Sequence, residues 1–133
     1  MSRSQSSEDL ADLLARYSPE VQKLALSTRS FVLGLIPNAI ELVDTKAKVV
    51  GYGYGPKYAD LICAIMPTKV GVTLGIARSA GLPDPSGLLQ GAGKVHRHVK
   101  IKDESDLKAA ALKALLQAAL SAYQNAPAQR VAT

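Results

Sequence analysis

The sequence has few residues that carry redox, metal or stacking chemistry. Of its 133 residues one is cysteine, two are histidine, one is phenylalanine and none is tryptophan. The single cysteine, Cys63, excludes a disulfide framework and a cysteine-rich zinc site. No apolar run approaches the roughly 18 residues that span a bilayer, and the polar start MSRSQSSED lacks the basic and then apolar pattern of a signal peptide. We therefore expect a cytoplasmic protein without a membrane partner.

The composition is that of an ordinary globular protein. Hydrophobic residues make up 47% of the chain and charged residues 20%, which is enough to bury one sizeable core. The length fits a single domain. We expect this domain to span residues 1–126 and residues 127–133 to form a flexible tail.

The beginning and the end of the chain have the apolar spacing of helices. Between about residues 7 and 36, apolar residues recur every three or four positions. Ser18-Pro19-Glu20 combines a capping side chain, a proline suited to a first helical position and an acid suited to a positive helix end, so a second helix should begin there. After Pro37 we expect a short turn through residues 39–42. A last helix is expected from about 104 to 124, capped by Asp103 or Ser105.

Between these helices the pattern changes to the period of two that is typical of strands. We expect a sheet over about residues 46–102, with strands at 46–54, 59–66, 70–77 and 95–102. In the third strand Val72, Leu74 and Ile76 should face the core, whereas Gly71, Thr73, Gly75 and Ala77 leave a face with almost no side chains. That face either packs closely under a helix or remains open to another molecule. In the second case it could be a dimer surface. The expected fold class is α+β, with N-terminal helices, a four-stranded and mainly antiparallel sheet, and the C-terminal helix packed on one sheet face.

Three segments resemble the YdhG-like family, known as domain of unknown function 1801. They are YGYGPKYADLICAI at 52–65, KVGVTLGIA at 69–77 and, most specifically, GLPDPSGLLQGAGKVHRHVKI at 81–101. In the last segment the matching residues are Leu82, Asp84, Pro85, Leu89, Gly91, Gly93, Lys94, Arg97 and His98. The resemblance implies a sheet packed against terminal helices, an architecture related to that of frataxin. It also implies one alternative function, a frataxin-like iron-binding chaperone, although most members of the family have no assigned activity.

The residues themselves argue against iron transport. Iron ions prefer carboxylate ligands, and the N-terminal acids Glu8, Asp9 and Asp12 are explained as charges that favour the start of a helix. His96 and His98 have the spacing of two metal ligands on one strand, but no third ligand is in view and neighbouring cations would repel a metal. We therefore predict no metal site and no cofactor.

The positive charge is concentrated in the predicted sheet. Residues 45–102 contain nine basic and two acidic residues, a balance of +7, and because the whole chain carries +5, the remainder carries −2. Alternation in the fourth strand places His96, His98, Lys100 and Lys102 on one face, opposite Val95, Arg97, Val99 and Ile101.

This pattern predicts an anion site. Backbone N–H groups around Gly91 and Gly93, with Lys94 beside them, could hold a phosphate or carboxylate; the full candidate set is Gly91, Gly93, Lys94, His96, Arg97, His98 and Lys100. A nucleotide-binding P-loop is excluded because Val95 follows the lysine where serine or threonine is needed. In the competing interpretation the glycines only make a turn, Asp84 organises the Pro-rich bend, and the basic stripe is a solvated sheet face.

Other candidate groups favour a structural role. Cys63 should be a buried core residue, and Tyr52 and Tyr54 could stack a planar ligand but fit a half-buried sheet face equally well. No arrangement of catalytic residues stands out, so we predict no catalytic site. The expected function is a binding or accessory protein for an anionic small molecule or an acidic protein surface. Non-specific nucleic-acid binding is the second alternative, for which aromatic residues are few.

Overall fold

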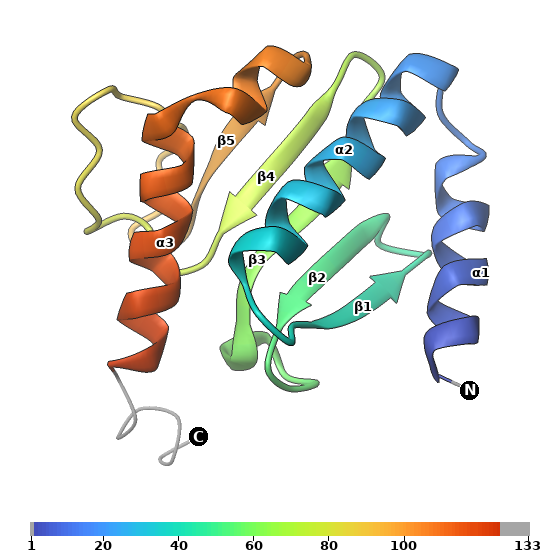
Figure 1. The fold of residues 1–133 in the computed structure, drawn as a ribbon, viewed down its shortest axis with the longest axis horizontal. Helices are drawn as coiled ribbons and strands as arrows, with labels where there is room; N and C mark the ends of the chain where they lie inside the picture. The colour runs from blue at the N-terminus through green and yellow to red at the C-terminus, as the bar shows by residue number, and fades with distance from the viewer. Residues whose placement is uncertain (1, 126–133) are drawn as a thin grey trace.

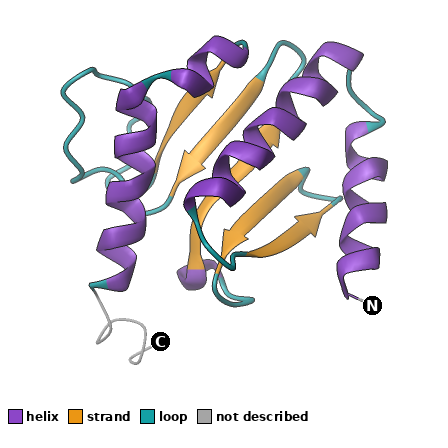
Figure 2. Ribbon diagram, viewed as in Figure 1, coloured by secondary structure: helices purple, strands orange, loops and turns teal. Residues whose placement is uncertain are grey.

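Helices begin and end the described chain, and a sheet lies between them (Figures 1 and 2). The computed structural model describes residues 2–125. Its elements in chain order are α1 (Ser2–Leu14), α2 (Pro19–Leu35), β1 (Ile40–Asp44), β2 (Val49–Gly53), the 3₁₀ helix η1 (Tyr58–Asp60), β3 (Leu61–Pro67), β4 (Val72–Ile76), β5 (Arg97–Ile101), the 3₁₀ helix η2 (Glu104–Lys108) and α3 (Ala110–Gln124). The α+β class is therefore confirmed.

The break between the first two helices lies where the sequence predicts it. The hydroxyl of Ser18 accepts a hydrogen bond of 3.2 Å from the backbone N–H of Val21, and Pro19 is the first residue of α2. α1 starts earlier than expected, at Ser2. None of the helices within residues 2–125 is long and apolar enough to cross a membrane. The predicted tail, 127–133, lies outside the described residues.

The last predicted helix, 104–124, is divided in the structure. Asp103 accepts a hydrogen bond from the backbone N–H of Ser105, and Asp106 accepts one from the backbone N–H of Asp103. This reciprocal capping stabilises the short helix η2. Ala109 then takes an extended conformation (ψ 125°), so α3 begins only at Ala110.

The sheet has five strands instead of the predicted four, and they follow one another as an antiparallel meander in the order β1-β2-β3-β4-β5. The missed strand is β1, which we predicted as a turn. Asn38 has a positive φ of 60°, a conformation that asparagine tolerates and that reverses the chain after α2. Residues 46–48, predicted as the start of a strand, form the β1–β2 turn, in which Oδ1 of Asp44 accepts the N–H groups of Lys46 (3.1 Å) and Ala47 (3.0 Å).

One face of this sheet is covered by α2 and α3, and α1 lies beside the edge strand β1 (Figure 1). The side chains buried between helices and sheet include Leu13, Leu24, Val32, Val50, Ile62, Cys63, Ile65, Val72, Leu74, Ile76, Val99, Ile101, Leu112 and Leu116. The predicted burial of Val72, Leu74 and Ile76 is confirmed, as is the C-terminal helix on one face.

A bulge in β3 corrects the predicted orientation of that strand. Alternation predicts Leu61 on the same face as Cys63 and Ile65. In the structure Tyr52 pairs with Cys63 and Gly53 pairs with Leu61, which leaves Ile62 as an extra residue. Because one extra residue reverses the alternation, Ile62 is buried, whereas the Leu61 side chain lies against Gly51 on the opposite face.

The face opposite α2 and α3 is called the open face. Its side chains, given by the strand register, are Ile40, Leu42 and Asp44 of β1, Val49 and Gly51 of β2, Leu61, Ala64 and Met66 of β3, Thr73 and Gly75 of β4, and His98 and Lys100 of β5. The strand β4 contributes the nearly bare face that its sequence predicts. Because no helix covers this face, its apolar side chains from β1, β2 and β3 are partly exposed to solvent.

Burial makes Cys63 unreactive, which can be tested. Loss of solvent raises the pKa of the Cys63 thiol to about 12, so at pH 8 its thiolate fraction should be about a thousandfold below that of a free thiol. We expect an aromatic disulfide reagent to react at least that much more slowly with the native protein than with protein unfolded in guanidinium. The absorbance of the released thiolate measures both rates. Native and unfolded rates within a factor of about ten of each other would contradict this burial.

Candidate functional site

A shallow hollow of about 280 Å³ lies on the open face over β3 and β4. Its walls are mainly apolar and include Leu61, Ala64, Met66 and Ala77, and His96 and Arg97 also line it. Gly75 of β4 lines this hollow and has no side chain to fill it. A Cβ atom at Gly75 would lie 3.0 Å from the terminal methyl of Met66, so the β3 side chain lies across the glycine.

His96 contributes to this hollow from outside the sheet. The sequence predicts it inside a strand that begins at Val95, but β5 begins at Arg97. The backbone N–H of Arg78 donates to Nδ1 of His96 over 2.9 Å, and this contact turns the ring toward the end of β4. An imidazole that accepts at Nδ1 carries its proton at Nε2 when neutral. His96 can therefore donate a hydrogen bond to an acceptor in the hollow.

Arg97 is held in place by two hydrogen bonds. Its backbone N–H donates to the hydroxyl of the buried Ser79 over 3.0 Å, and its Nε donates to the carbonyl of Gly93 over 3.0 Å. Its terminal nitrogens complete a planar group of N–H donors whose geometry matches a carboxylate. As predicted, its register places its side chain on the same side as Val99, the face opposite the hollow, so Arg97 borders the hollow without a guanidinium established inside it.

Arg78 is bound to other parts of the fold. Its guanidinium donates to the carbonyl oxygens of Ala59 (3.4 Å) and Leu61 (2.9 Å) and lies 5.4 Å from the centre of the Tyr123 ring. These contacts join the start of β3 and the end of β4 to α3. Arg78 thus supports the hollow without supplying a group to it.

The predicted anion nest at residues 91–94 is an exposed turn. Gly91 has a positive φ of 105°. A Cβ atom at Gly93 would lie 2.3 Å from the carbonyl oxygen of His96, so only glycine permits the close approach. Lys94 is exposed and does not line the hollow. Val95, expected on the apolar face, is 53% exposed because it lies at the tip of this turn and not in β5.

His98 and Lys100 occupy the open face, as alternation in β5 predicts. Backbone hydrogen bonds between His98 and Gln90 (2.7 and 3.1 Å) add a short outer partner to β5. The ring of His98 lies within 3.3 Å of the position that a Cβ at Gly91 would take. Lys102, predicted on the same face, falls beyond the end of the strand, where its backbone N–H donates to Asp106.

Asp84 organises the Pro-rich loop, as the competing interpretation of the sequence proposed. Its two carboxylate oxygens accept the backbone N–H groups of Leu88 and Leu89, each over 2.9 Å. Its carbonyl accepts the N–H of Gly87 over 3.1 Å. The loop that leads to the turn at residues 91–94 is thereby fixed by local hydrogen bonds.

The two tyrosines considered for stacking are engaged in the fold. Tyr52 is fully buried and its hydroxyl donates to Glu41 over 2.7 Å; burial raises the pKa of this phenol. The hydroxyl of Tyr54 donates to the carbonyl of Pro37 over 2.7 Å, and its ring centre lies 5.8 Å from that of Tyr123. Tyr52 therefore has no exposed ring face on which a ligand could stack. The ring of Tyr54 already contacts Tyr123 of α3.

Sequence reasoning missed a partly buried ion pair. Arg29 of α2 contacts Glu41 of β1 through two hydrogen bonds, of 2.6 and 3.2 Å, and Glu41 also accepts the hydroxyl of Tyr52. The hydrogen bond to Glu41 raises the pKa of Arg29. The signal that could have revealed it was the alternation at residues 40–44, but we assigned residues 39–42 to a turn.

The seven candidate residues thus form three groups: His96 and Arg97 at the hollow, Gly91, Gly93 and Lys94 in the exposed turn, and His98 and Lys100 along β5. Within residues 2–125 no group of three His, Cys, Asp or Glu side chains is placed to hold a metal ion. No protein-family model matches the chain, and neither a curated protein nor a solved structure matches it significantly.

Proposed function

We propose that this chain is a small cytoplasmic binding or accessory protein of the YdhG-like type that holds a molecule with one carboxylate and an apolar body. The carboxylate is held by Nε2–H of His96 at the border of the hollow. The apolar body lies in the hollow on β3 and β4. This proposal narrows the broader expectation of an anionic ligand or acidic partner.

The observation that carries the proposal is the union of an apolar hollow with one side-chain donor, Nε2–H of His96. Leu61, Ala64 and Met66 supply apolar surface, and His96 and Arg97 line the same hollow. A single imidazole N–H can donate to one oxygen of a carboxylate. A phosphate dianion is a poorer fit, because apolar walls cannot replace the water that it loses.

The same observations bear on the nucleic-acid alternative. Single-stranded nucleic acid is held by aromatic rings that stack on its bases and by cations that follow its backbone. Tyr52 is buried and Tyr54 packs near Tyr123. These two rings are therefore not available to stack on nucleic-acid bases, which argues against the nucleic-acid alternative.

Titration of ¹⁵N-labelled protein tests the carboxylate site. We expect octanoate to shift the backbone amides of Ala77, His96 and Arg97, and to bind at least about tenfold more tightly than acetate, because two buried methylene groups already contribute about 1.6 kcal/mol. Inorganic phosphate should bind no better than acetate. Equal affinity for acetate and octanoate would show that the hollow takes no part.

Two variants separate the hollow from the turn. Ala64→Glu places a carboxylate among the apolar walls and should abolish octanoate binding by repulsion. Lys94→Gln removes the exposed charge of the turn at residues 91–94 and should change the affinity less than about twofold. The reverse result, with loss of binding in Lys94→Gln and retention in Ala64→Glu, would place the site in the turn and overturn the proposal.

A further inference from the structure

The open face has opposite charges at its two edges. Asp44 lies on β1, paired with Val49, and Lys100 lies on β5, paired with Thr73, which in turn pairs with Met66 of β3. These residues lie toward the same end of the sheet. Five strands at a spacing of about 4.8 Å place the two charges roughly 19 Å apart. Among the described residues neither Asp44 nor Lys100 forms an ion pair.

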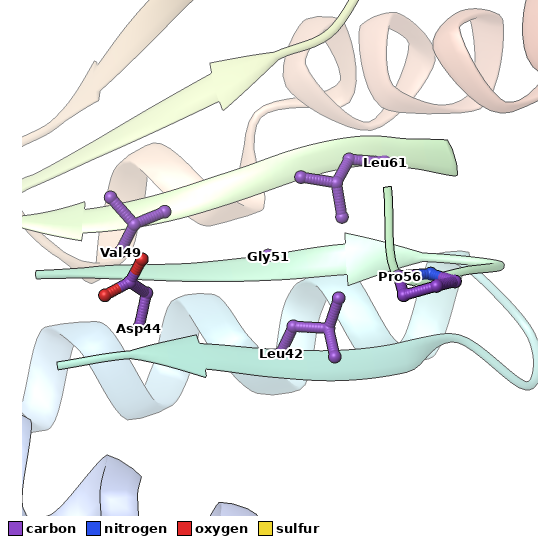
Figure 3. Close-up of a pocket in the computed structure, with 6 residues that line it drawn as sticks. All are labelled: Leu42, Asp44, Val49, Gly51, Pro56 and Leu61. Atoms are coloured by element: carbon purple, nitrogen blue, oxygen red, sulfur yellow. The ribbon is translucent and has the colours of Figure 1, made fainter. Parts of the chain in front are cut away.

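Most of the surface between these charges is apolar. Figure 3 looks onto the β1–β3 part of the open face, where Leu42 and Leu61 lie on either side of Gly51, and Asp44 lies beside Val49. Ile40 and Leu42 are 44% and 37% exposed and lie next to each other on this face of β1. Such a patch with charged edges is typical of a surface that meets another protein.

We propose that a second copy of this chain covers the open face, related by a two-fold axis parallel to β3. Under this rotation β1 of one protomer lies over β5 of the other, because the axis reverses the order of the strands. Asp44 then faces Lys100 of the partner subunit, and Lys100 faces Asp44 of the partner subunit, so that two equivalent ion pairs close the interface. The apolar side chains of β2 and β3 meet at its centre.

Charge selects a second copy over a partner of another kind. A uniformly acidic partner would attract Lys100 but repel Asp44, whereas a copy of this chain satisfies both. The direction of the axis follows from the same charges. A two-fold axis across the strands would place β5 over β5 and bring Lys100 close to Lys100 of the partner subunit.

The size of the face sets the strength of the dimer. Five strands of about five residues each give roughly 400 Å² per protomer from strand spacing and rise, which is typical of a weak and transient interface. The small residues Gly51, Ala64 and Gly75 in the middle let the two faces approach. The dimer should therefore form at tens to hundreds of micromolar, an order of magnitude expected for small interfaces.

The second copy also completes the proposed ligand site, and this part of the inference rests on the proposed function. The hollow over β3 and β4 is open, so a bound apolar chain would remain partly in water. A second protomer on the open face closes the hollow and buries the ligand from both sides. Octanoate should consequently tighten the dimer, because a ligand that binds one state shifts the equilibrium toward it.

Sedimentation equilibrium of the wild type and charge-reversal variants tests the arrangement. D44K or K100D alone turns both ion pairs into like charges and should weaken the dimer about tenfold or more. D44N keeps an acceptor for the N–H groups of Lys46 and Ala47 and should weaken the dimer less than D44K. The double variant D44K/K100D restores opposite charges and should dimerise within about threefold of the wild type. As a matched control, K23E/E104K reverses the exposed pair between α2 and η2 and should leave the dimer unchanged. Circular dichroism confirms that each variant is folded.

The outcomes separate this inference from the proposed function. A wild type that remains monomeric at several hundred micromolar with octanoate present overturns the dimer, even when octanoate still shifts the amides of Ala77 and His96. Failure of D44K/K100D to recover what the single variants lose overturns the proposed arrangement. Conversely, recovery in the double variant without any octanoate binding supports the dimer and refutes the carboxylate site.

Discussion

Replacing Glu41 with alanine is expected to lower the free energy of unfolding by about 2 kcal/mol, because it leaves the buried hydroxyl of Tyr52 without an acceptor and the partly buried Arg29 without its partner. The Glu41 side chain is only 12% exposed and joins Arg29 of α2 to Tyr52 of β2. Its loss removes the partner of Arg29 and the acceptor of a fully buried hydroxyl. Urea denaturation monitored by circular dichroism measures the change.

A second ion pair in the same protein provides the control. Lys23 and Glu104 are 3.8 Å apart, and their side chains are 78% and 48% exposed. Because water screens such a pair, Glu104→Ala should change the stability by less than about 0.5 kcal/mol. The double variant R29A/E41A should cost less than its two single variants together, since removing both partners leaves no unpaired charge. Equal losses in Glu41→Ala and Glu104→Ala would show that burial of the pair contributes nothing.

The parts of the fold that follow from local chemistry could be predicted from the sequence. Ser18 and Pro19 define the start of α2 through groups within one turn of each other. The alternation of Val72, Leu74 and Ile76 predicts which face of β4 is buried, because successive side chains of a strand point to opposite faces and no distant contact is needed to assign them. Asp84 organises its loop through N–H groups four and five residues away.

The parts that depend on distant contacts could not be predicted. β1 is an edge strand whose residues pair with β2 across a turn, and its five residues contain a mixture of apolar and acidic side chains that also fits a helical turn. The bulge at Ile62 is invisible in the composition of β3, since Leu61, Ile62 and Cys63 are all apolar. It is this extra residue that transfers Leu61 to the open face.

The candidate site shows the same division. Alternation correctly placed His98 and Lys100 on the open face. The position of His96 is determined by Arg78, which is 18 residues earlier in the chain and donates to its ring. No local pattern contains that contact. The net charge of +7 over residues 45–102 therefore predicts where the basic residues are concentrated. Which of the seven candidate residues border the hollow depends on the fold, and these are His96 and Arg97.

Replacing Gly53 with alanine is expected to lower the free energy of unfolding by about 3 kcal/mol, as overpacking against backbone atoms does. A Cβ atom at Gly53 would lie 2.1 Å from the carbonyl oxygen of Asp60 and 2.7 Å from Cα of Leu61. Both neighbours belong to the backbone, so no side-chain rotation relieves the contact. β2 and β3 must separate at the bulge, which removes Leu61 from the open face together with part of the wall of the hollow. Urea denaturation measures the stability, and the octanoate titration measures the site.

Gly34 is the matched control, because the same substitution there meets nothing within 4 Å. It lies within α2, where alanine favours the helix over glycine by about 0.5–1 kcal/mol. Gly34→Ala should thus stabilise the protein and leave octanoate affinity unchanged, whereas Gly53→Ala should weaken both. A Gly53→Ala protein as stable as the wild type would mean that β2 and the backbone of residues 60–61 do not approach each other closely. The placement of Leu61 on the open face, on which the hollow and the proposed dimer both depend, would then have to be abandoned.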